Sequence, residues 1–274
     1  MPERSNAPIG VFDSGVGGLS VLQALQAEMP AERFVYVADS GHAPYGERDD
    51  THVLQRSHRI AAFLIAQHHI KSLVVACNTA TAAAIQTLRD RHQGLPLVGI
   101  EPALKPAIAT TQTGLIAVLA TRGTLNSEKF KALQNQLRPS ARLILQPCDG
   151  LANAIECNDG PRIDTLISIY LGQLGPLGCG PGHIDSLVLG CTHYPFVLPR
   201  LRAISGPDVR YFDGGLPVAR RTRHLLTEAS LLTPAPCASQ PDRVAFYTTG
   251  VADELAKAVD RWMGWQPTVV ALTV

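Results

Sequence analysis

In the stretch LVVACNTA at residues 73–80, an apolar run leads into a cysteine that polar residues follow. The stretch LVLGCTHY at residues 187–194 repeats this arrangement. A short apolar run of this kind is typical of a buried strand, so each stretch predicts a cysteine just after a strand. Ligands of open α/β sheets bind outside the carboxyl ends of the strands. The two stretches therefore predict related halves that bring two thiols, Cys77 and Cys191, to one pocket.

Further apolar runs alternate with stretches of helical periodicity, such as the spacing of Leu19, Leu22, Leu25 and Met29. This alternation indicates βαβ units and a parallel sheet. We expect strands near residues 9–12, 34–38, 72–76, 97–100, 115–119, 143–145, 186–189, 209–212 and 244–247.

The two halves of the chain also resemble each other in sequence. The strand that contains Gly10 compares with the one that contains Ala117, and the strand from Leu73 compares with the strand from Leu187. The two pairs are separated by similar offsets, which favours an internal duplication. We therefore predict an α/β fold of two pseudo-symmetric, doubly wound domains, each with a mainly parallel sheet flanked by helices.

Proline and glycine mark two crossings between the halves. Pro102 and Pro106 flank the first crossing, and the tripeptide SGP at residues 205–207 marks the second. The chain is expected to return after the second crossing and complete the first domain. The predicted domains are residues 1–99 with 208–274, and residues 100–207.

The composition excludes several classes of function. Hydrophobic residues make up 46% of the 274 positions, charged residues only 17%, and the formal net charge is +1. Such a chain has no strong field for nucleic acid or a membrane surface. No basic segment precedes an apolar stretch at the start, and no apolar segment is long enough to span a bilayer. We expect a cytoplasmic protein that binds neither nucleic acid nor membrane.

The six cysteines show no Cys-x-x-Cys spacing, and a chain of this length does not need disulfides. Reduced thiols are therefore expected. Two segments rich in glycine or proline, residues 175–182 and 233–241, are predicted surface loops. The cysteines expected to be small buried hydrophobes are Cys148, Cys157, Cys179 and Cys237.

The motif FDSGVGG at residues 12–18 follows a predicted strand and precedes a predicted helix, so its amides can meet a carboxylate or phosphate. Asp39, after the next strand, makes a dinucleotide-binding fold one alternative. Against that alternative, Ser20 stands where the third glycine is needed, and Asp13 would lie where pyrophosphate approaches. We favour Asp13 as a functional acid, with a solvated or capping role in an ordinary turn as the other interpretation.

Polar side chains beside the two cysteines can orient a small substrate. Asn78 and Thr79 follow Cys77, and Thr192 and His193 follow Cys191. Amide and hydroxyl groups can hold a carboxylate or amino group, and imidazole can act as base, acid or orienting group beside a thiol. Two such thiols suit proton transfer on opposite faces of one carbon.

Two other chemistries remain alternatives for these residues. A hydrolase that uses Cys191 as its nucleophile leaves Cys77 unexplained. A zinc site of Cys77, Cys191 and His193 is disfavoured because Cys-x-His spacing is poor for two ligands and no further pair supports it.

Taken together, several motifs make the chain similar to the bacterial glutamate racemases, a branch of the aspartate/glutamate racemase superfamily. They agree in order and spacing from about residue 9 to about residue 220. The stretch DGG at residues 213–215 departs from the more usual pattern of the family, which contains Asp-Ser. The motifs that carry the resemblance are FDSGVGG (12–18), ADS (38–40), PYG (44–46), ACNTA (76–80) and LGCTHYP (189–195).

The resemblance implies an isomerase that interconverts L-glutamate and D-glutamate without a cofactor or metal, for peptidoglycan synthesis, cell-wall biogenesis and cell shape. It implies that Cys77 takes the α-proton of D-glutamate and Cys191 that of L-glutamate. Asp13 would then assist Cys77, and His193 would assist Cys191. Substrate binding is assigned by the same resemblance to Asp13, Ser14, Pro44, Tyr45, Gly46, Asn78, Thr79, Thr192 and Glu156.

Other functions stay open at this point. A related racemase or decarboxylase acting on aspartate, a hydantoin or malonate is one alternative. A non-catalytic protein that binds a small molecule is another. Glutamate is the expected small-molecule partner, and a homodimer is retained as a further expectation.

Overall fold

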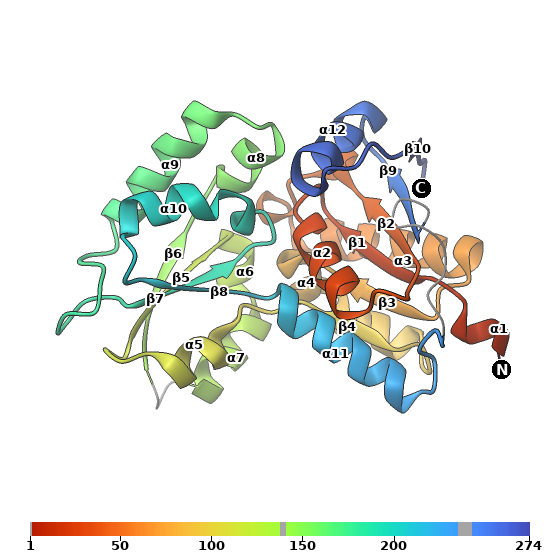
Figure 1. Ribbon diagram of the computed structural model, residues 1–274, viewed down its shortest axis with the longest axis horizontal. Coiled ribbons are helices and arrows are strands. Elements are labelled where there is room, and N and C mark those ends of the chain that lie inside the picture. Colours follow the sequence, from red (N-terminus) through yellow and green to blue (C-terminus); the bar gives the residue numbers. More distant parts are fainter. Residues whose placement is uncertain (1, 138–140, 235–242) are drawn as a thin grey trace. The chain divides into compact units, whose positions relative to one another are not determined.

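The computed structural model describes residues 2–137, 141–234 and 243–274, and it divides into two compact units (Figure 1). Unit 1 comprises Met1–Ile100 and Gly215–Val274, and unit 2 comprises Glu101–Gly214. Strands and helices alternate through both units. The strand pairs in the described part of the chain are all parallel, as the alternating pattern predicts.

Unit 1 contains a six-stranded sheet in the order β10-β9-β2-β1-β3-β4. Every residue of β1, β2 and β3 is buried, which explains why these strands are continuous apolar runs. The order reverses between β1 and β3, so their carboxyl ends form the switch point of the sheet. The strands are β1 (Ile9–Asp13), β2 (Phe34–Ala38), β3 (Ser72–Val75), β4 (Leu97–Gly99), β9 (Val244–Thr248) and β10 (Val269–Ala271).

Helices cover both faces of this sheet (Figure 1). On one face, Phe12 and Val75 share a core with Ile60 of α3 and Ala84 of α4. Helices α2 and α11 pack against each other on the other face. The helices of unit 1 are α1 (Pro2–Ser5), α2 (Leu19–Glu28), α3 (Asp50–His68), α4 (Asn78–Arg91), α11 (Gly215–Glu228) and α12 (Ala252–Met263), with 3-10 turns η1 (Ser40–His42) and η2 (Tyr45–Glu47).

Unit 2 contains a four-stranded sheet in the order β6-β5-β7-β8. Alternate residues of β5 serve opposite cores: Leu119 packs with Ile155 of α8, and Val118 packs with Phe130 of α7. The strands are β5 (Leu115–Ala120), β6 (Arg142–Pro147), β7 (Ser186–Gly190) and β8 (Arg210–Asp213). The helices are α5 (Leu104–Thr110), α6 (Arg122–Asn126), α7 (Glu128–Leu137), α8 (Leu151–Glu156), α9 (Gly160–Gly172) and α10 (Leu198–Ser205), with the 3-10 turn η4 (Tyr194–Val197).

The two sheets repeat one arrangement of strands. The order β2-β1-β3-β4 in unit 1 corresponds to β6-β5-β7-β8 in unit 2. Gly10 pairs with Leu73 in the first sheet, and Ala117 pairs with Leu187 in the second. These are the residues that the internal sequence comparison matched. The predicted α/β fold of two related parallel sheets flanked by helices is confirmed.

The second crossing between the units lies after β8, whereas the sequence placed it at residue 207. Arg210 of β8 pairs with Ser186 of β7, so this strand belongs to the sheet of unit 2. The SGP tripeptide instead ends α10, where Gly206 adopts a positive φ of 83° after the last turn. The first crossing follows Ile100.

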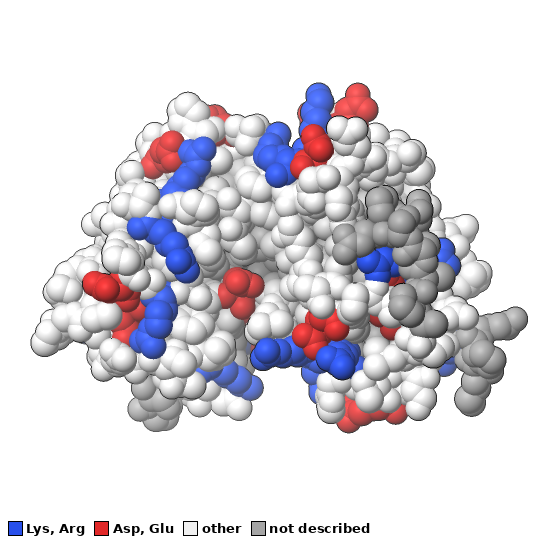
Figure 2. All heavy atoms as spheres, in the orientation of Figure 1, with Lys and Arg blue, Asp and Glu red and all other residues white. Residues whose placement is uncertain are grey.

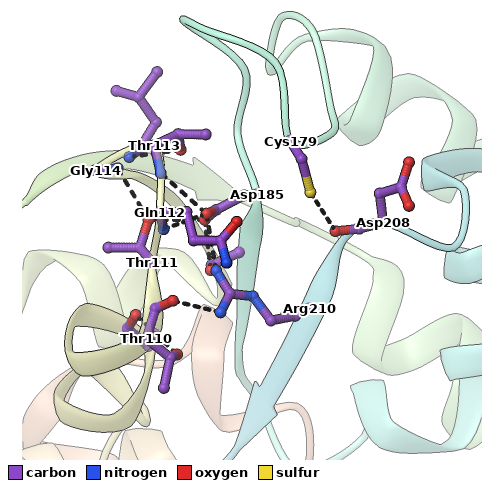
Figure 3. Close-up of polar contacts among 12 residues, drawn as sticks. Thr110, Thr111, Gln112, Thr113, Gly114, Cys179, Asp185, Asp208 and Arg210 are labelled. Atoms are coloured by element: carbon purple, nitrogen blue, oxygen red, sulfur yellow. Dashed lines mark hydrogen bonds and ion pairs between the residues drawn. The ribbon is translucent and has the colours of Figure 1, made fainter.

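Three of the four minor cysteines lie in the described residues, and of these three Cys148 is buried as predicted. Cys157 and Cys179 are exposed: Cys157 is the C-cap residue after α8, and Cys179 lies in the glycine-rich loop after α9. The thiol of Cys179 donates to the carbonyl oxygen of Asp208 at 3.4 Å (Figure 3). Cys237 and most of the predicted loop at residues 233–241 lie outside the described residues.

Charges of both signs are spread over the face drawn in Figure 2, where Lys and Arg side chains lie among Asp and Glu. Exposed ion pairs in the structure include Arg122 with Asp149 and Arg200 with Asp164. Within the described residues, no helix has the length and apolar character needed to cross a membrane.

Asp185 anchors the start of the sheet in unit 2 (Figure 3). This buried carboxylate precedes β7 and accepts hydrogen bonds from the Thr111 hydroxyl at 2.8 Å and from the main-chain N–H groups of Gln112 and Thr113 at 2.6 and 3.1 Å. Arg210, the first residue of β8, forms an ion pair with it at 2.9 Å. One side chain thereby joins the loop before β5 to β7 and β8.

The same contacts determine the titration of Asp185. Burial alone would raise its pKa, but the hydrogen bonds from the Gln112 N–H and the Ser186 and Thr111 hydroxyls lower the pKa to about 2. Because this pKa is below the ordinary 3.8, the carboxylate stabilises the fold above about pH 4, and the contribution is lost as pH falls through about 2.

We predict that Asp185→Asn lowers the free energy of unfolding by about 1–3 kcal/mol at neutral pH, because amide donors and Arg210 lose a charged acceptor. The variant should also lose part of the acid-dependent decrease in stability below pH 4. Urea unfolding followed by circular dichroism at several pH values measures both effects. Asp149→Asn, in an exposed ion pair, is the control and should change stability little. Wild-type stability in Asp185→Asn would contradict this role.

Candidate active site

Cys77 lies at the carboxyl end of β3 and is the N-cap residue of α4. Its sulfur accepts a hydrogen bond from the N–H of Ala80 at 3.4 Å, and its thiol lies 3.7 Å from the Ser14 hydroxyl oxygen. Only 6% of the residue is exposed. The N-terminus of a 14-residue helix favours negative charge, so this position suits a thiolate.

Asp13 ends β1, the strand next to β3, and its side chain is completely buried. Its carboxylate accepts from the N–H of Gly15 at 2.8 Å, and the Ser14 hydroxyl lies 3.4 Å from the same oxygen. Ser14 therefore stands between the carboxylate of Asp13 and the thiol of Cys77. Gly18 permits this arrangement, because a Cβ there would lie 2.6 Å from that of Asp13.

Asn78 and Thr79 form the buried first turn of α4 beside Cys77. Among the described residues, the Asn78 side-chain oxygen is buried without a hydrogen-bond partner. A buried acceptor without a donor costs about 1–3 kcal/mol, so such atoms are expected where a ligand supplies the donor. An ammonium group meets that requirement.

The tripeptide PYG at residues 44–46 lies after β2, where Tyr45 begins the turn η2. Tyr45 is 1% exposed, and Pro44 and Gly46 are half-buried. The Tyr45 hydroxyl donates to Asp39 at 2.5 Å, so it is already engaged within the protein. Its hydroxyl stays protonated, since burial and the neighbouring Asp39 raise the pKa of Tyr45 far above its usual value.

Asp39 itself does not serve as a ribose-binding acid. Its two carboxylate oxygens accept from Tyr45, from Arg56 at 2.8 and 2.9 Å and from the Thr249 hydroxyl at 2.7 Å. The hydrogen bond to Asp39 is the main cause that raises the pKa of Arg56. The dinucleotide-binding alternative thus loses the residue that suggested it. Arg56 and Thr249 are contacts that no local motif indicated.

In unit 2, Cys191 follows β7, and His193 lies two residues further along the chain. The His193 Nδ1 atom is 3.6 Å from the Cys191 sulfur, and its Nε2 atom is 2.6 Å from a carboxylate oxygen of Glu156. Cys191 and His193 are buried, and 20% of the Glu156 side chain is exposed. The three residues form one continuous chain of polar contacts.

The Cys191 thiol and Glu156 together control the charge of His193. Burial by itself lowers the pKa of His193, but the hydrogen bonds to Cys191 and Glu156 outweigh burial and raise the pKa well above its usual value. The raised pKa favours the cationic form of His193. A cation beside the sulfur can stabilise a thiolate or return a proton to it.

Residue patterns alone indicated only a solvated carboxylate at Glu156, and the family resemblance singled it out. Its contact with His193 arises because α8, which ends at Glu156, packs against the turn η4 that follows His193. Thr192 is also buried beside Cys191. No spacing rule links α8 to this turn, so the contact needs the tertiary fold.

Each unit therefore gathers its own set of expected residues at the carboxyl ends of its strands. Within the described part of the chain, no group of three His, Cys, Asp or Glu side chains is arranged as metal ligands would be. Unit 1 brings together Asp13, Ser14, Cys77, Asn78 and Thr79, and unit 2 brings together Glu156, Cys191, Thr192 and His193.

A family model described as Asp/Glu/Hydantoin racemase matches residues 9–221. This chain belongs to that family. It is 47% identical over 266 residues to the glutamate racemase of Pseudomonas entomophila, with 96% of each chain covered. The fold is similar to a glutamate racemase from Bacillus anthracis, with a TM-score of 0.86, 30% identity and 98% of each chain covered.

A glutamate racemase from Francisella tularensis, solved in complex with D-glutamate, is also similar, with a TM-score of 0.82, 26% identity and 98% of each chain covered. The family and these relatives identify the protein as an amino-acid racemase, an enzyme of the isomerase class. The expectation of a homodimer stays a prediction.

We predict that Glu156→Gln lowers the pKa of His193, because the imidazolium loses its charged acceptor. Titration of labelled histidine by NMR measures the shift directly. The wild-type pair stabilises the fold below about pH 6.5, and this contribution is lost as pH rises through the higher folded-state pKa. Glu228→Gln, which breaks the exposed pair with His224, is the control and should leave the His193 titration unchanged. An unshifted titration in Glu156→Gln would exclude the carboxylate as the cause.

Proposed function

We propose that this racemase interconverts L-glutamate and D-glutamate by a cofactor-independent transfer of protons between two thiols, and that it supplies D-glutamate for peptidoglycan synthesis. The observation that carries the proposal is the repeated position of one buried cysteine after β3 and after β7. The glutamate racemases to which the chain is similar, one of them solved with D-glutamate, support the choice of substrate.

In the proposed reaction, the Cys77 thiolate removes the α-proton of D-glutamate, and the thiol of Cys191 delivers a proton to the opposite face of the same carbon. The roles of the thiols are exchanged when L-glutamate reacts. One C–H bond breaks as an S–H bond forms, and the reverse happens at the other sulfur. No electrons leave the substrate, so the reaction requires no redox partner.

The two thiols receive different assistance in this proposal. Cys77 has the N-terminus of α4 and a hydroxyl link through Ser14 to Asp13. Cys191 has the imidazole of His193, which Glu156 holds by its other nitrogen. General acid–base catalysis typically contributes about 10²–10⁴ in rate. The remaining acceleration would come from fixed dipoles that stabilise the carbanion in a buried site.

Substrate binding follows from the polar groups around each thiol. The Asn78 oxygen, which lacks a donor, would accept from the α-ammonium group of glutamate. Hydroxyls of Ser14, Thr79 and Thr192 would donate to its carboxylates. The half-buried Pro44 and Gly46, on either side of Tyr45, would form a wall beside the substrate. The ammonium charge would lower the free energy of the α-carbanion.

We predict that the wild-type enzyme exchanges the α-proton of both glutamate enantiomers with deuterated solvent, and that Cys77→Ser and Cys191→Ser each reduce racemisation by about 10³-fold or more. Serine is a far weaker acid than cysteine, so neither variant retains a base at the substituted position. Circular dichroism follows racemisation, and proton NMR follows exchange. Cys157→Ser, which changes an exposed thiol, is the matched control and should keep full activity.

The same assay separates the alternatives. Wild-type protein that exchanges the α-proton of aspartate or of a hydantoin but not that of glutamate would identify a different racemase of the family. Loss of carbon dioxide from a malonate would indicate a decarboxylase. Binding of glutamate without any exchange would indicate a non-catalytic protein. Full racemisation by either serine variant would refute the two-thiol mechanism.

We predict opposite effects of Asn78→Leu on stability and on substrate binding. Leucine removes a buried acceptor that lacks a partner, so thermal stability should stay equal or rise. The KM for glutamate should rise by about tenfold, because the substrate ammonium loses its acceptor. Thermal unfolding and steady-state kinetics test the two parts. A large loss of stability, or an unchanged KM, would contradict the assignment of the Asn78 oxygen to substrate.

A further inference from the structure

Asp39 is a buried carboxylate that the proposed proton transfer does not use. It follows β2, its side chain is completely buried, and its own N–H donates to the carbonyl oxygen of Asp13 at 2.9 Å. One oxygen accepts from Arg56 and Thr249, and the other accepts from Arg56 and Tyr45. Four donors from three separate segments converge on one side chain.

These donors fix segments that lie far apart in the sequence. Arg56 belongs to α3, Thr249 follows β9, and Tyr45 begins η2. Arg56 also donates to the main-chain oxygen of Val274 at 2.7 Å. Gly41 allows the close approach, because a Cβ there would lie 2.5 Å from the Thr249 carbonyl oxygen. The segment between β2 and α3 is therefore held at its start and at Tyr45.

The segment held in this way borders the Cys77 site. The turn η2 packs against α4, the helix that Cys77 caps. Tyr45 and Cys77 belong to one buried cluster, together with Phe12 of β1. Because the Tyr45 ring is fixed by this packing and by its hydroxyl, the neighbouring main chain at Pro44 and Gly46 has one defined position.

We propose that Asp39, held by its ion pair with Arg56, is a positioning residue that fixes Tyr45 and thereby the Pro44–Gly46 wall of the substrate site. This role rests on the proposed glutamate racemisation. It identifies Asp39 as a further residue that determines the affinity of the enzyme for its substrate. Asp39 touches neither substrate nor thiol. Its effect is on the geometry of the site, so its loss changes KM more than kcat.

A second buried ion pair in the same unit provides a matched control. Lys71 and Glu32 are almost completely buried and paired, and Thr233 donates its hydroxyl to Glu32 at 2.9 Å. Lys71 and Glu32 precede β3 and β2 respectively, so the pair lies at the amino ends of the strands, opposite the edge that carries Cys77. Breaking either pair leaves a buried charge, which costs stability in both cases.

The experiment compares Asp39→Asn, Glu32→Gln and Tyr45→Phe in the full-length enzyme. Thermal unfolding reports stability, and circular dichroism reports kcat and KM for each glutamate enantiomer. We expect Asp39→Asn and Glu32→Gln both to lower the unfolding temperature. Of these two ion-pair variants, Asp39→Asn should raise KM by about tenfold with a smaller change in kcat, whereas Glu32→Gln should leave KM unchanged.

Tyr45→Phe removes one hydroxyl and leaves the Asp39 ion pair intact, so it keeps the test decisive if Asp39→Asn does not fold. It should raise KM in the same direction with a smaller loss of stability. An unchanged KM in Tyr45→Phe and Asp39→Asn overturns the positioning role while racemisation stands. An equal rise of KM in Glu32→Gln also overturns it, because the effect would then follow from stability alone. A wild-type enzyme that does not racemise glutamate overturns the proposed function and this inference together.

Discussion

The rest of the structure depends on one constraint, the reversal of strand order within a parallel sheet. In unit 1, the connections from β1 and β3 leave toward opposite sides, and in unit 2 the same is true of β5 and β7. The chain therefore does not cover the carboxyl ends of these strands, and polar groups can be placed there at little cost to the core. Asp13 and Cys77 occupy this position in one sheet, and Cys191 occupies it in the other.

The repeated backbone does not impose repeated chemistry. After β3 the chain enters the long helix α4 directly, so the peptide groups of α4 act on Cys77. After β7 it enters the four-residue turn η4, which provides no comparable helix N-terminus, and the charge is supplied by His193 and Glu156. Equivalent sulfur positions are thus served by a backbone dipole in one case and by a side-chain ion pair in the other. Two sheets with the same strand order thus carry different polar groups at corresponding positions.

The sequence predicted those parts of the fold that depend on local pattern. Apolar runs located the strands of the central sheets, and the match of Gly10 with Ala117 and of Leu73 with Leu187 agrees with the register. The end of unit 2 was misplaced because a Gly-Pro turn ends a helix as readily as it ends a domain. Glu156, Arg56 and Thr249 could not be identified from the residues alone, since their contacts depend on helices and loops that meet only after folding. The family resemblance supplied Glu156 but not the other two.

Cys77 serves two purposes at once, as the cap of α4 and as the sulfur of the site. Cysteine is a weaker acceptor than the oxygen side chains that commonly cap helices, and serine is among the best of those. The first turn of α4 is therefore less stable than it would be with serine as the N-cap residue. An oxygen at this position would stabilise the start of the helix more, whereas the proposed proton transfer requires the more acidic hydrogen of a thiol. In the proposed mechanism, reactivity at Cys77 is therefore obtained at some cost to the stability of the fold.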